Sequence, residues 1–339
     1  MRLLSIVLSM VALIGCGPES SDKLRVQIFT GAYSSTPVHV ADQLGFFKRY
    51  GLDIQKERAS SSSAALAAMI GGSIDIVESG ADLVLANIDK GTKLKFLMSN
   101  ESTNYVTLVV GSHIENTSFS DDYKKILLDL RGKRIGVNAI GSTLHLATLM
   151  MLRESGLSAD DVHFVSTGSA ATTLSAWQAG SVDAQITFAP IPELLENLGL
   201  AKTSFVLADT GPEALRFDGL YGGWVTTQRF LDNHQSQADN FILAMSDAIN
   251  WIRDPANKEV LLEITRQHAP VSALTLDENG AILSQMIQRY KRYWGYEISP
   301  EAISKWNNYA MYFDLINEPI KFERVVYEGA PICEKPPCQ

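Results

Sequence analysis

The sequence is poor in cysteine and contains none of the common catalytic motifs. Cys333 and Cys338 stand without a neighbouring histidine or further cysteine, which leaves them short of the ligands that a structural zinc site uses. The six histidines are dispersed, and the chain contains no HExxH, GxSxG or GxxxxGK[ST] motif. These absences disfavour metallohydrolases and phosphate-loop enzymes, and we expect no metal, no cofactor and no catalytic residue.

Long apolar runs and excess positive charge are also missing. After residue 13, no run of apolar residues approaches the roughly 20 that a membrane-crossing helix needs. The formal net charge of −9 disfavours nucleic acids and anionic lipid surfaces as partners. With 46% hydrophobic residues in 339, the chain can bury two cores. We therefore expect a monomer that binds a small molecule.

The N-terminus has the pattern of an export signal. Arg2 precedes an almost wholly apolar stretch over residues 3–13, which is too short to span a bilayer. The stretch ends in Leu13-Ile14-Gly15-Cys16, which resembles the lipobox of bacterial lipoproteins and implies that Cys16 is acylated. We expect a signal peptide over residues 1–15, a polar tether over residues 16–23 and a lipid anchor at the cell envelope. An ordinary signal peptide, in which Cys16 is incidental, is the alternative.

The two other cysteines lie close together near the C-terminus. An oxidising compartment outside the cytoplasm would let Cys333 and Cys338 pair. Because the loop between them is short, we expect the bond to fix the tail over residues 326–339 and to add little to overall stability.

A repeat divides the remaining chain into two similar units. Residues 66–75 read LAAMIGGSID and residues 174–183 read LSAWQAGSVD. Each copy predicts a helix that ends at glycine and is followed by a short buried strand. The separation of the copies suits one small domain each and is too long for a solenoid repeat. We therefore expect two α/β lobes with a cleft between them, and we expect Trp177 in the core.

Strand and helix patterns alternate through both units. They predict parallel sheets flanked by helices, with two segments, residues 105–110 and 221–227, crossing between the lobes as a hinge. The first lobe would comprise residues 24–108 and 216–325, and the second residues 109–215. From residue 233 the pattern is helical, and we assign its two apolar stripes to the core of the first lobe. They contain Phe241, Met245, Ile249 and Ile252, and Met286, Tyr290 and Tyr293.

Hydroxyl side chains gather where predicted strands lead into helices. Ligands of open α/β sheets bind at such junctions, where helix N-termini present unpaired N–H groups. The hydroxyls could hold an anion without Arg or Lys, although each one alone is equally consistent with a helix cap. The residues are Ser34, Ser35, Ser61, Ser62, Ser79 with Gly80, Ser142 and Thr143.

Aromatic and acidic residues also lie near the predicted strand ends. Tyr33, Tyr105, Tyr221 and Trp224 could wall a mostly apolar pocket. A carboxylate of Glu78 or Glu101 facing the cleft would suit an amine or N–H group, and we expect at least one of the two to face solvent instead. His39 and His145, on helices that begin at the cleft, are weaker candidates for contacts.

Several short motifs are spread over most of residues 24–230. They are PVHVADQLGFF at residues 37–47, YGLD at 50–53, GSID at 72–75, LRGKRIGV at 130–137, GS at 141–142, GL at 156–157 and GSVDA at 180–184. Together they resemble the solute-binding proteins of ABC importers in the nitrate, sulfonate, taurine and thiamine-pyrimidine group. The resemblance implies a periplasmic-binding-protein type II fold, two lobes that close on a solute, and partners consisting of a membrane permease and its ATPase.

The family's ligand contacts can be carried over by position. They fall on Tyr33, Ser34, Ser35, Ser61, Ser62, Ser79, Gly80, Ser142, Thr143, Thr187, Pro190 and Trp224. The resemblance favours a lipoprotein receptor for a small organic anion or polar heteroaromatic solute, such as a sulfonate, taurine or nitrate. A pyrimidine- or menaquinone-pathway enzyme on the same fold is one alternative, although the cysteine cluster of fungal pyrimidine synthases is missing. A sensory receptor domain is the other.

Overall fold

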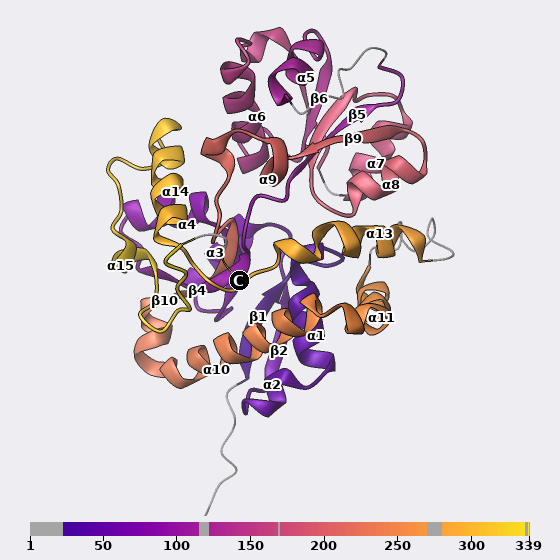
Figure 1. Cartoon of the computed structure of the whole chain (residues 1–339). Helices are drawn as coiled ribbons and strands as arrows, with labels where there is room; N and C mark the ends of the chain where they lie inside the picture. Colours follow the sequence, from indigo (N-terminus) through magenta and orange to yellow (C-terminus); the bar gives the residue numbers. More distant parts are fainter. Residues whose placement is uncertain (1–22, 115–121, 169, 270–279, 336–337, 339) are drawn as a thin grey trace, which may run out of the picture.

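The chain folds into two α/β halves: the strands of the first form a two-stranded and a three-stranded sheet, and those of the second form one five-stranded mixed sheet (Figure 1). The computed structural model describes residues 23–114, 122–168, 170–269, 280–335 and 338. The expected signal peptide, Cys16 and the tether up to residue 22 lie outside the described residues. Within the described residues, no helix combines the length and the apolarity needed to cross a membrane.

The first half contains both the N-terminal strands and a strand from much later in the chain. The strands are β1 (Leu24–Ile28), β2 (Ile54–Arg58), β3 (Val77–Gly80), β4 (Leu94–Glu101) and β10 (Gly222–Thr227). β1 pairs in parallel with β2, and a parallel bridge from Val26 to Ile76 joins this pair to the segment before β3. β10 lies between β3 and β4 and is antiparallel to both.

The second half repeats this arrangement. Its strands are β5 (Thr107–Gly111), β6 (Arg134–Val137), β7 (His163–Ser166), β8 (Ala184–Thr187) and β9 (Ala201–Val206). They lie in the order β7, β6, β8, β5, β9. β6 is parallel to β7 and β8, whereas β5 is antiparallel to β8 and β9.

The expectation of parallel sheets was therefore wrong for one strand in each half. β5 follows β4 of the first half, and β10 follows β9 of the second, so each strand has just crossed from the other sheet. Such a strand enters its new sheet from the far end and runs against its neighbours, because it lacks the long crossover that parallel pairing requires. The two segments predicted to cross between the lobes are these two strands.

Helices connect the strands and cover the sheets. Those of the first half are α1 (Thr36–Gln43), α2 (Phe46–Arg49), α3 (Ser62–Ile70) and α4 (Ala81–Asp89). Those of the second are α5 (Tyr123–Asp129), α6 (Thr143–Glu154), α7 (Ala170–Gln178), α8 (Ile191–Asn197) and α9 (Leu207–Thr210). The C-terminal part adds α10 (Gln228–Arg253), α11 (Lys258–His268), α13 (Ala281–Tyr290), α14 (Pro300–Tyr312) and α15 (Phe322–Val325).

The sequence repeat corresponds to the same ion pair in both halves. The Asp75 carboxylate accepts hydrogen bonds from the backbone N–H of Arg25 at 2.8 Å and from its Nε at 2.9 Å. Asp183 accepts the same two bonds from Arg134, at 2.8 and 2.9 Å. In each case the aspartate, which lies between the repeat helix and the next strand, is tied to the start of another strand of the same half, β1 or β6. Hydrogen bonds from Arg134 hold the pKa of Asp183 well below its usual range.

The C-terminal helices are buried as predicted, and one of them contacts both halves. Phe241, Met245, Ile249 and Ile252 of α10 are fully or almost fully buried. α13 packs against α11 on the first half and also against α8 of the second half, and it lies between the two sheets in Figure 1. Arg289 of α13 donates to Glu193 of α8 at 2.8 Å, and the hydroxyls of Tyr290 and Thr107 lie 2.9 Å apart.

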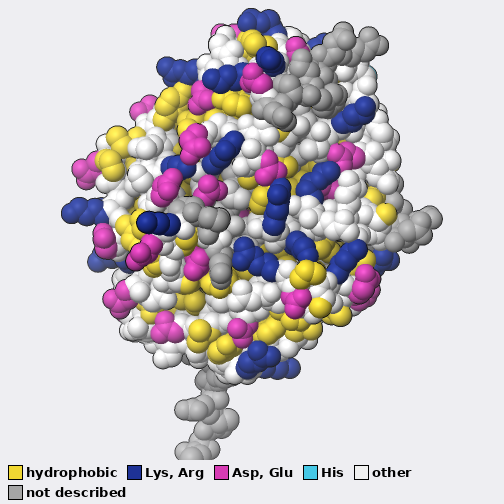
Figure 2. Space-filling model, in the orientation of Figure 1, with side chains coloured by type: hydrophobic (Ala, Val, Ile, Leu, Met, Phe, Trp, Pro, Cys, Tyr) yellow, Lys and Arg dark blue, Asp and Glu magenta, His cyan; other side chains and the backbone are white. Residues whose placement is uncertain are grey.

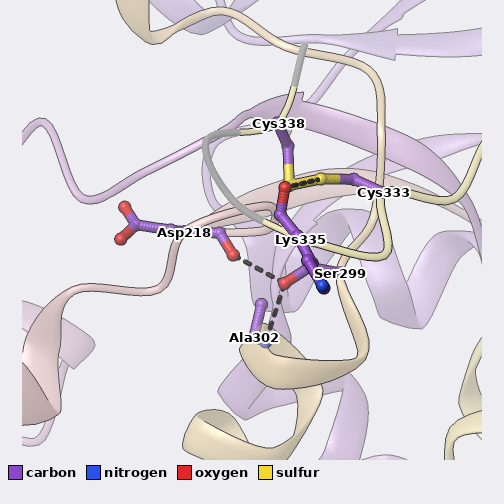
Figure 3. Close-up of a disulfide and its surroundings, with 6 residues drawn as sticks. All are labelled: Asp218, Ser299, Ala302, Cys333, Lys335 and Cys338. Carbon is purple, nitrogen blue, oxygen red and sulfur yellow. Dashed lines mark hydrogen bonds between the residues drawn. A yellow bond between two sulfur atoms is a disulfide. The ribbon is translucent and has the colours of Figure 1, made fainter.

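A disulfide closes the C-terminal segment (Figure 3). Cys333 and Cys338 are bonded, with their Cα atoms 5.6 Å apart. The backbone N–H of Cys333 donates to the Ile298 carbonyl at 3.0 Å, which attaches this segment to the residues before α14. There Ser299 caps α14 by accepting from the Ala302 N–H at 3.0 Å and donates to the Asp218 carbonyl at 2.7 Å.

Candidate functional site

A cavity of about 610 Å³ lies between the two halves. Its first-half lining comes from the segments after β1, before α3 and at the junction of β3 and α4. Its second-half lining comes from the start of α6 and from Phe188 and Ala189, after β8. Tyr105, between β4 and β5, and Tyr221, just before β10, bring the crossing segments into the wall. The expected cleft is therefore present and is lined by both halves.

Most of the residues expected to contact a ligand line this cavity. They are Tyr33, Ser34, Ser61, Ser62, Gly80, Ser142 and Thr143. Ser61 caps α3 by accepting from the Ala64 N–H at 3.2 Å, and Ser142 caps α6 by accepting from the His145 N–H at 3.3 Å. Because α3 and α6 belong to different halves, the cavity receives two helix N-termini from opposite sides.

The other expected contacts are absent from the cavity wall. Ser35 accepts from the Phe29 N–H at 2.9 Å, and Ser79 and Thr187 are buried within β3 and β8. Pro190 lines a separate, smaller pocket beside His39 and Met286. The sequence placed these residues correctly at strand ends, but at each end only some of the side chains face the cavity.

Trp224 is also absent from the cavity wall. Its side chain is completely buried in the middle of β10, where its Nε1 donates to the Asn100 Oδ1 at 3.2 Å. Its ring lies 5.5 Å from that of Phe241 on α10. Side chains alternate between the faces of a strand, and Trp224 lies on the face that packs against α10. It is a core residue, as is Trp177, whose Nε1 donates to Gln185 at 2.7 Å.

Two histidines considered as weaker candidates lie outside the cavity wall as well. His39 stacks on His268 with ring centroids 3.6 Å apart, and burial lowers the pKa of His39 to about 3. His145 accepts a hydrogen bond at Nδ1 from the Gly141 N–H at 3.0 Å, within the turn that leads into α6. Both side chains therefore have structural contacts that account for them.

Three carboxylates line the cavity. The exposed fraction is 8% for Glu78, 3% for Asp82 and 1% for Glu101. The expectation that at least one of Glu78 and Glu101 faces solvent was therefore wrong. Burial raises the pKa of Glu78 to about 7, against a hydrogen bond from Ser34 that lowers it. Burial and the nearby charge of Glu78 raise the pKa of Glu101 well above its usual range. Burial also raises the pKa of Asp82, which the sequence analysis did not single out although it lies two residues after Gly80.

Gly222 allows two of these carboxylates to approach the same point. It pairs with Gly80 on one side and Glu101 on the other, at the start of β10. A Cβ atom at Gly222 would lie 2.6 Å from Glu101 Oε2 and 3.2 Å from Glu78 Oε1. The first distance is shorter than real Cβ contacts, so this position requires glycine for the carboxylates to keep their places.

Aromatic rings form much of the remaining wall. Tyr105 lies between Phe188 and Tyr221, with ring centroids 5.5 and 6.0 Å away. Tyr33 stacks on Trp294 at 4.0 Å, and Trp306 of α14 also reaches the cavity. Phe188 directly follows a buried strand and Trp306 lies on the apolar face of an amphipathic helix, and both patterns are typical of core residues. No local signal distinguishes such a residue from one that lines a cavity.

Hydrogen bonds cross the cleft at the start of α6. The Thr143 Oγ1 donates to the Asp82 carboxylate of α4, and the Tyr309 hydroxyl of α14 donates to the Thr143 carbonyl at 3.2 Å. One residue of the second half thus contacts two helices that pack with the first. These contacts bring the two walls of the cavity together.

Sequence comparisons connect this chain to binding proteins. The family described as "NMT1/THI5 like" matches residues 32–258. The taurine-binding periplasmic protein of Escherichia coli (strain K12) is 25% identical over 243 residues, covering 68% of this chain and 70% of that protein. The putative binding protein YtlA of Bacillus subtilis (strain 168) is 21% identical over 296 residues, covering 86% and 82%.

Solved structures agree with the fold. The alkanesulfonate-binding protein SsuA from Xanthomonas axonopodis pv. citri, bound to MOPS, has a TM-score of 0.70 at 20% identity, covering 90% of this chain and 98% of that one. The periplasmic aliphatic sulphonate binding protein SsuA from Escherichia coli has a TM-score of 0.71 at 17% identity, covering 94% and 96%. The chain belongs to the NMT1/THI5-like family and has the periplasmic-binding-protein fold.

Proposed function

We propose that this protein is the solute-binding component of an ABC importer and captures a small organic solute between its two halves. The observation that carries the proposal is the cavity of about 610 Å³ lined from both halves. Its size and its mixture of aromatic walls with a few polar groups are typical of sites for small molecules. Relatives named for taurine and sulfonates support an imported solute, and the named binding proteins do not favour an enzyme.

Closure of the two halves would give the protein its function. The halves are joined by the segments that lead into β5 and β10, so a change in these two segments can move one sheet relative to the other. A solute that contacts both walls stabilises the closed arrangement by its extra affinity for that state. Ser61 and Ser62 from one half and Ser142 and Thr143 from the other are the contacts that we assign to this step, together with Tyr33, Ser34 and Gly80.

The cell-envelope location is part of the proposal. We assign residues 1–15 to a signal peptide, Cys16 to a lipid anchor and residues 16–23 to a tether, on the basis of the lipobox-like sequence. A monomer held in this way outside the cytoplasm could deliver its solute to a permease. The disulfide between Cys333 and Cys338 suits the same oxidising compartment.

A thermal-shift screen followed by calorimetry tests the proposal. The panel contains taurine, alkanesulfonates, nitrate, pyrimidines and small amines, because a ligand that binds the folded state raises its Tm. Thr143→Val should weaken binding of any solute found in this way, since it loses the hydroxyl that reaches Asp82. Ser155→Ala, at the opposite end of α6, is the matched control. A panel without any binder, or a binder that is indifferent to Thr143→Val, would contradict the proposal.

A further inference from the structure

The charges around the cavity indicate which solutes it accepts, an inference that rests on the proposed solute-binding function. Glu78, Asp82 and Glu101 line the cavity, and none of its described lining residues is Lys, Arg or His. Acidic and basic side chains are interspersed over the molecular face in Figure 2, whereas the described cavity lining carries acidic side chains without basic ones. A solute with only negative charge would meet three carboxylates and no cation.

Unpartnered acceptor atoms point to the same kind of solute. Glu101 is 1% exposed and Asp82 3%, yet Glu101 Oε2 and Asp82 Oδ1 have no hydrogen-bond partner among the described residues. The second oxygen of each is engaged, by the Asn100 amide at 3.0 Å and by the Thr143 hydroxyl. Buried polar atoms are nearly always paired, so Glu101 Oε2 in particular needs a donor, whereas the Asp82 carboxylate also lies close to the backbone N–H groups of Asp82 and Leu83. The cavity that they line is where a bound donor would lie.

Glu78 and Glu101 both reach the space beside Gly222, where one donor group could contact both. Glu101 Oε2 and Glu78 Oε1 both lie close to the space above its Cα, where a Cβ would be 2.6 and 3.2 Å from them. A group with two or more N–H donors could bridge these oxygens and would separate two carboxylates that otherwise repel each other. The surrounding rings of Tyr33, Tyr105 and Tyr221 provide faces that attract cations.

We propose that the cavity selects a small organic cation, an ammonium or amidinium group on an apolar or aromatic body, and binds this group between Glu78 and Glu101. An aminosulfonate meets the same requirement through its ammonium group, while its sulfonate can lie at the N-termini of α3 and α6. Sulfonates and other anions without such a donor are then poor ligands. The residues that decide the charge of the solute are thus on β3 and β4, and the helix caps are secondary to them.

Matched pairs of compounds test this selectivity on the unaltered protein. Benzamidine is compared with benzoate, and taurine with isethionate, which carries a hydroxyl in place of the ammonium. Thermal shift and calorimetry at pH 8 should show binding of benzamidine or taurine at least about 10-fold tighter than binding of its partner, as expected for a charge-assisted hydrogen bond. Equal or tighter binding of the anionic partners, or no binding by either cation, would overturn the inference.

Variants assign the effect to the two carboxylates. Glu101→Gln and Glu78→Gln keep the shape of the side chain, and each should weaken binding of the preferred cation about 10- to 100-fold. Glu259→Gln, on the exposed start of α11, is the control and should leave binding unchanged. If Glu101→Gln fails to fold, Glu78→Gln and the compound pairs still decide the question. Closure on a sulfonate without an amine would leave the proposed function intact and refute this inference alone.

Discussion

Replacing Glu78 by glutamine should make the protein less sensitive to alkaline pH. In the folded protein, burial raises the pKa of Glu78 to about 7, whereas an exposed glutamate in the unfolded chain has its ordinary pKa of 4.5. Below both values the carboxyl is protonated in either state, and no free energy is lost. As the pH rises from 4.5 through 7, the unfolded state releases its proton first, so the free energy of unfolding falls.

The size of this effect follows from the separation of the two pKa values. The difference corresponds to about 3 kcal/mol at pH 8, of which roughly 2 kcal/mol is lost between pH 5 and pH 8. Water in the cavity beside Glu78 screens its carboxylate, so about 3 kcal/mol is the largest effect expected. Glutamine has no proton to release, so the variant should gain stability relative to the wild type as the pH rises.

The assay is urea denaturation of wild type and Glu78→Gln at pH 5 and pH 8, followed by tryptophan fluorescence. Other groups titrate over the same range, including Glu193, whose pKa burial raises to about 7, so only the difference between the two proteins is interpreted. Glu259→Gln serves as the exposed control. A difference between variant and wild type that is the same at both pH values would refute the burial of Glu78 beside the cavity.

Four further expectations follow from the contacts described above. Gly222→Ala should lower the Tm and weaken solute binding, because its Cβ would lie 2.6 Å from Glu101 Oε2; an unchanged Tm and affinity would contradict the close approach. Trp224→Phe should lower the stability of the fold by about 1 kcal/mol, because a buried hydrogen bond is lost. Any change in tryptophan fluorescence on solute binding should persist in this variant, and its loss would show that Trp224 contacts the solute. Affinity for benzamidine should rise between pH 6 and pH 8, as Glu78 ionises in a setting that also contains Glu101, Asp82, Tyr33, Tyr105 and Tyr221; a flat profile in calorimetry would count against it. Replacing both cysteines, with Cys333→Ser and Cys338→Ser, should lower the free energy of unfolding by about 2 kcal/mol or less in denaturation experiments. A larger decrease would show that the disulfide stabilises more of the fold than the C-terminal segment.

The repeat shows why the two-half architecture was predictable from the sequence. Each copy brings an aspartate to the start of a buried strand, and in the fold Asp75 and Asp183 bind Arg25 and Arg134 in the same way. Gly72 and Gly180, which end the two repeat helices, both have positive φ, at 85° and 63°. Backbone geometry and pairing impose these requirements at single positions, so the residues at those positions could be predicted from the nearby sequence.

The direction of the crossing strands and the burial of the carboxylates depend on distant residues and were not predictable in the same way. The sequence of β10 would suit a parallel strand equally well. β10 is antiparallel to β3 and β4 because the chain enters it from the second half. Glu78 looked like a possible solvent-facing residue because nothing near it in sequence shows that β10 and Gly222 cover it. Likewise, α13 carries an ordinary apolar stripe, and its contact with α8 depends on Arg289 meeting Glu193 across the fold.

Small-angle scattering of the purified protein, with and without a saturating solute found in the screen, tests the central claim most directly. The account predicts that the radius of gyration decreases on binding, because one solute must contact Ser61 and Ser62 from one half and Ser142 and Thr143 from the other. It also predicts that Thr143→Val reduces the contraction at the same concentration of solute. An unchanged radius of gyration at proven saturation would contradict capture of the solute by closure of the two halves.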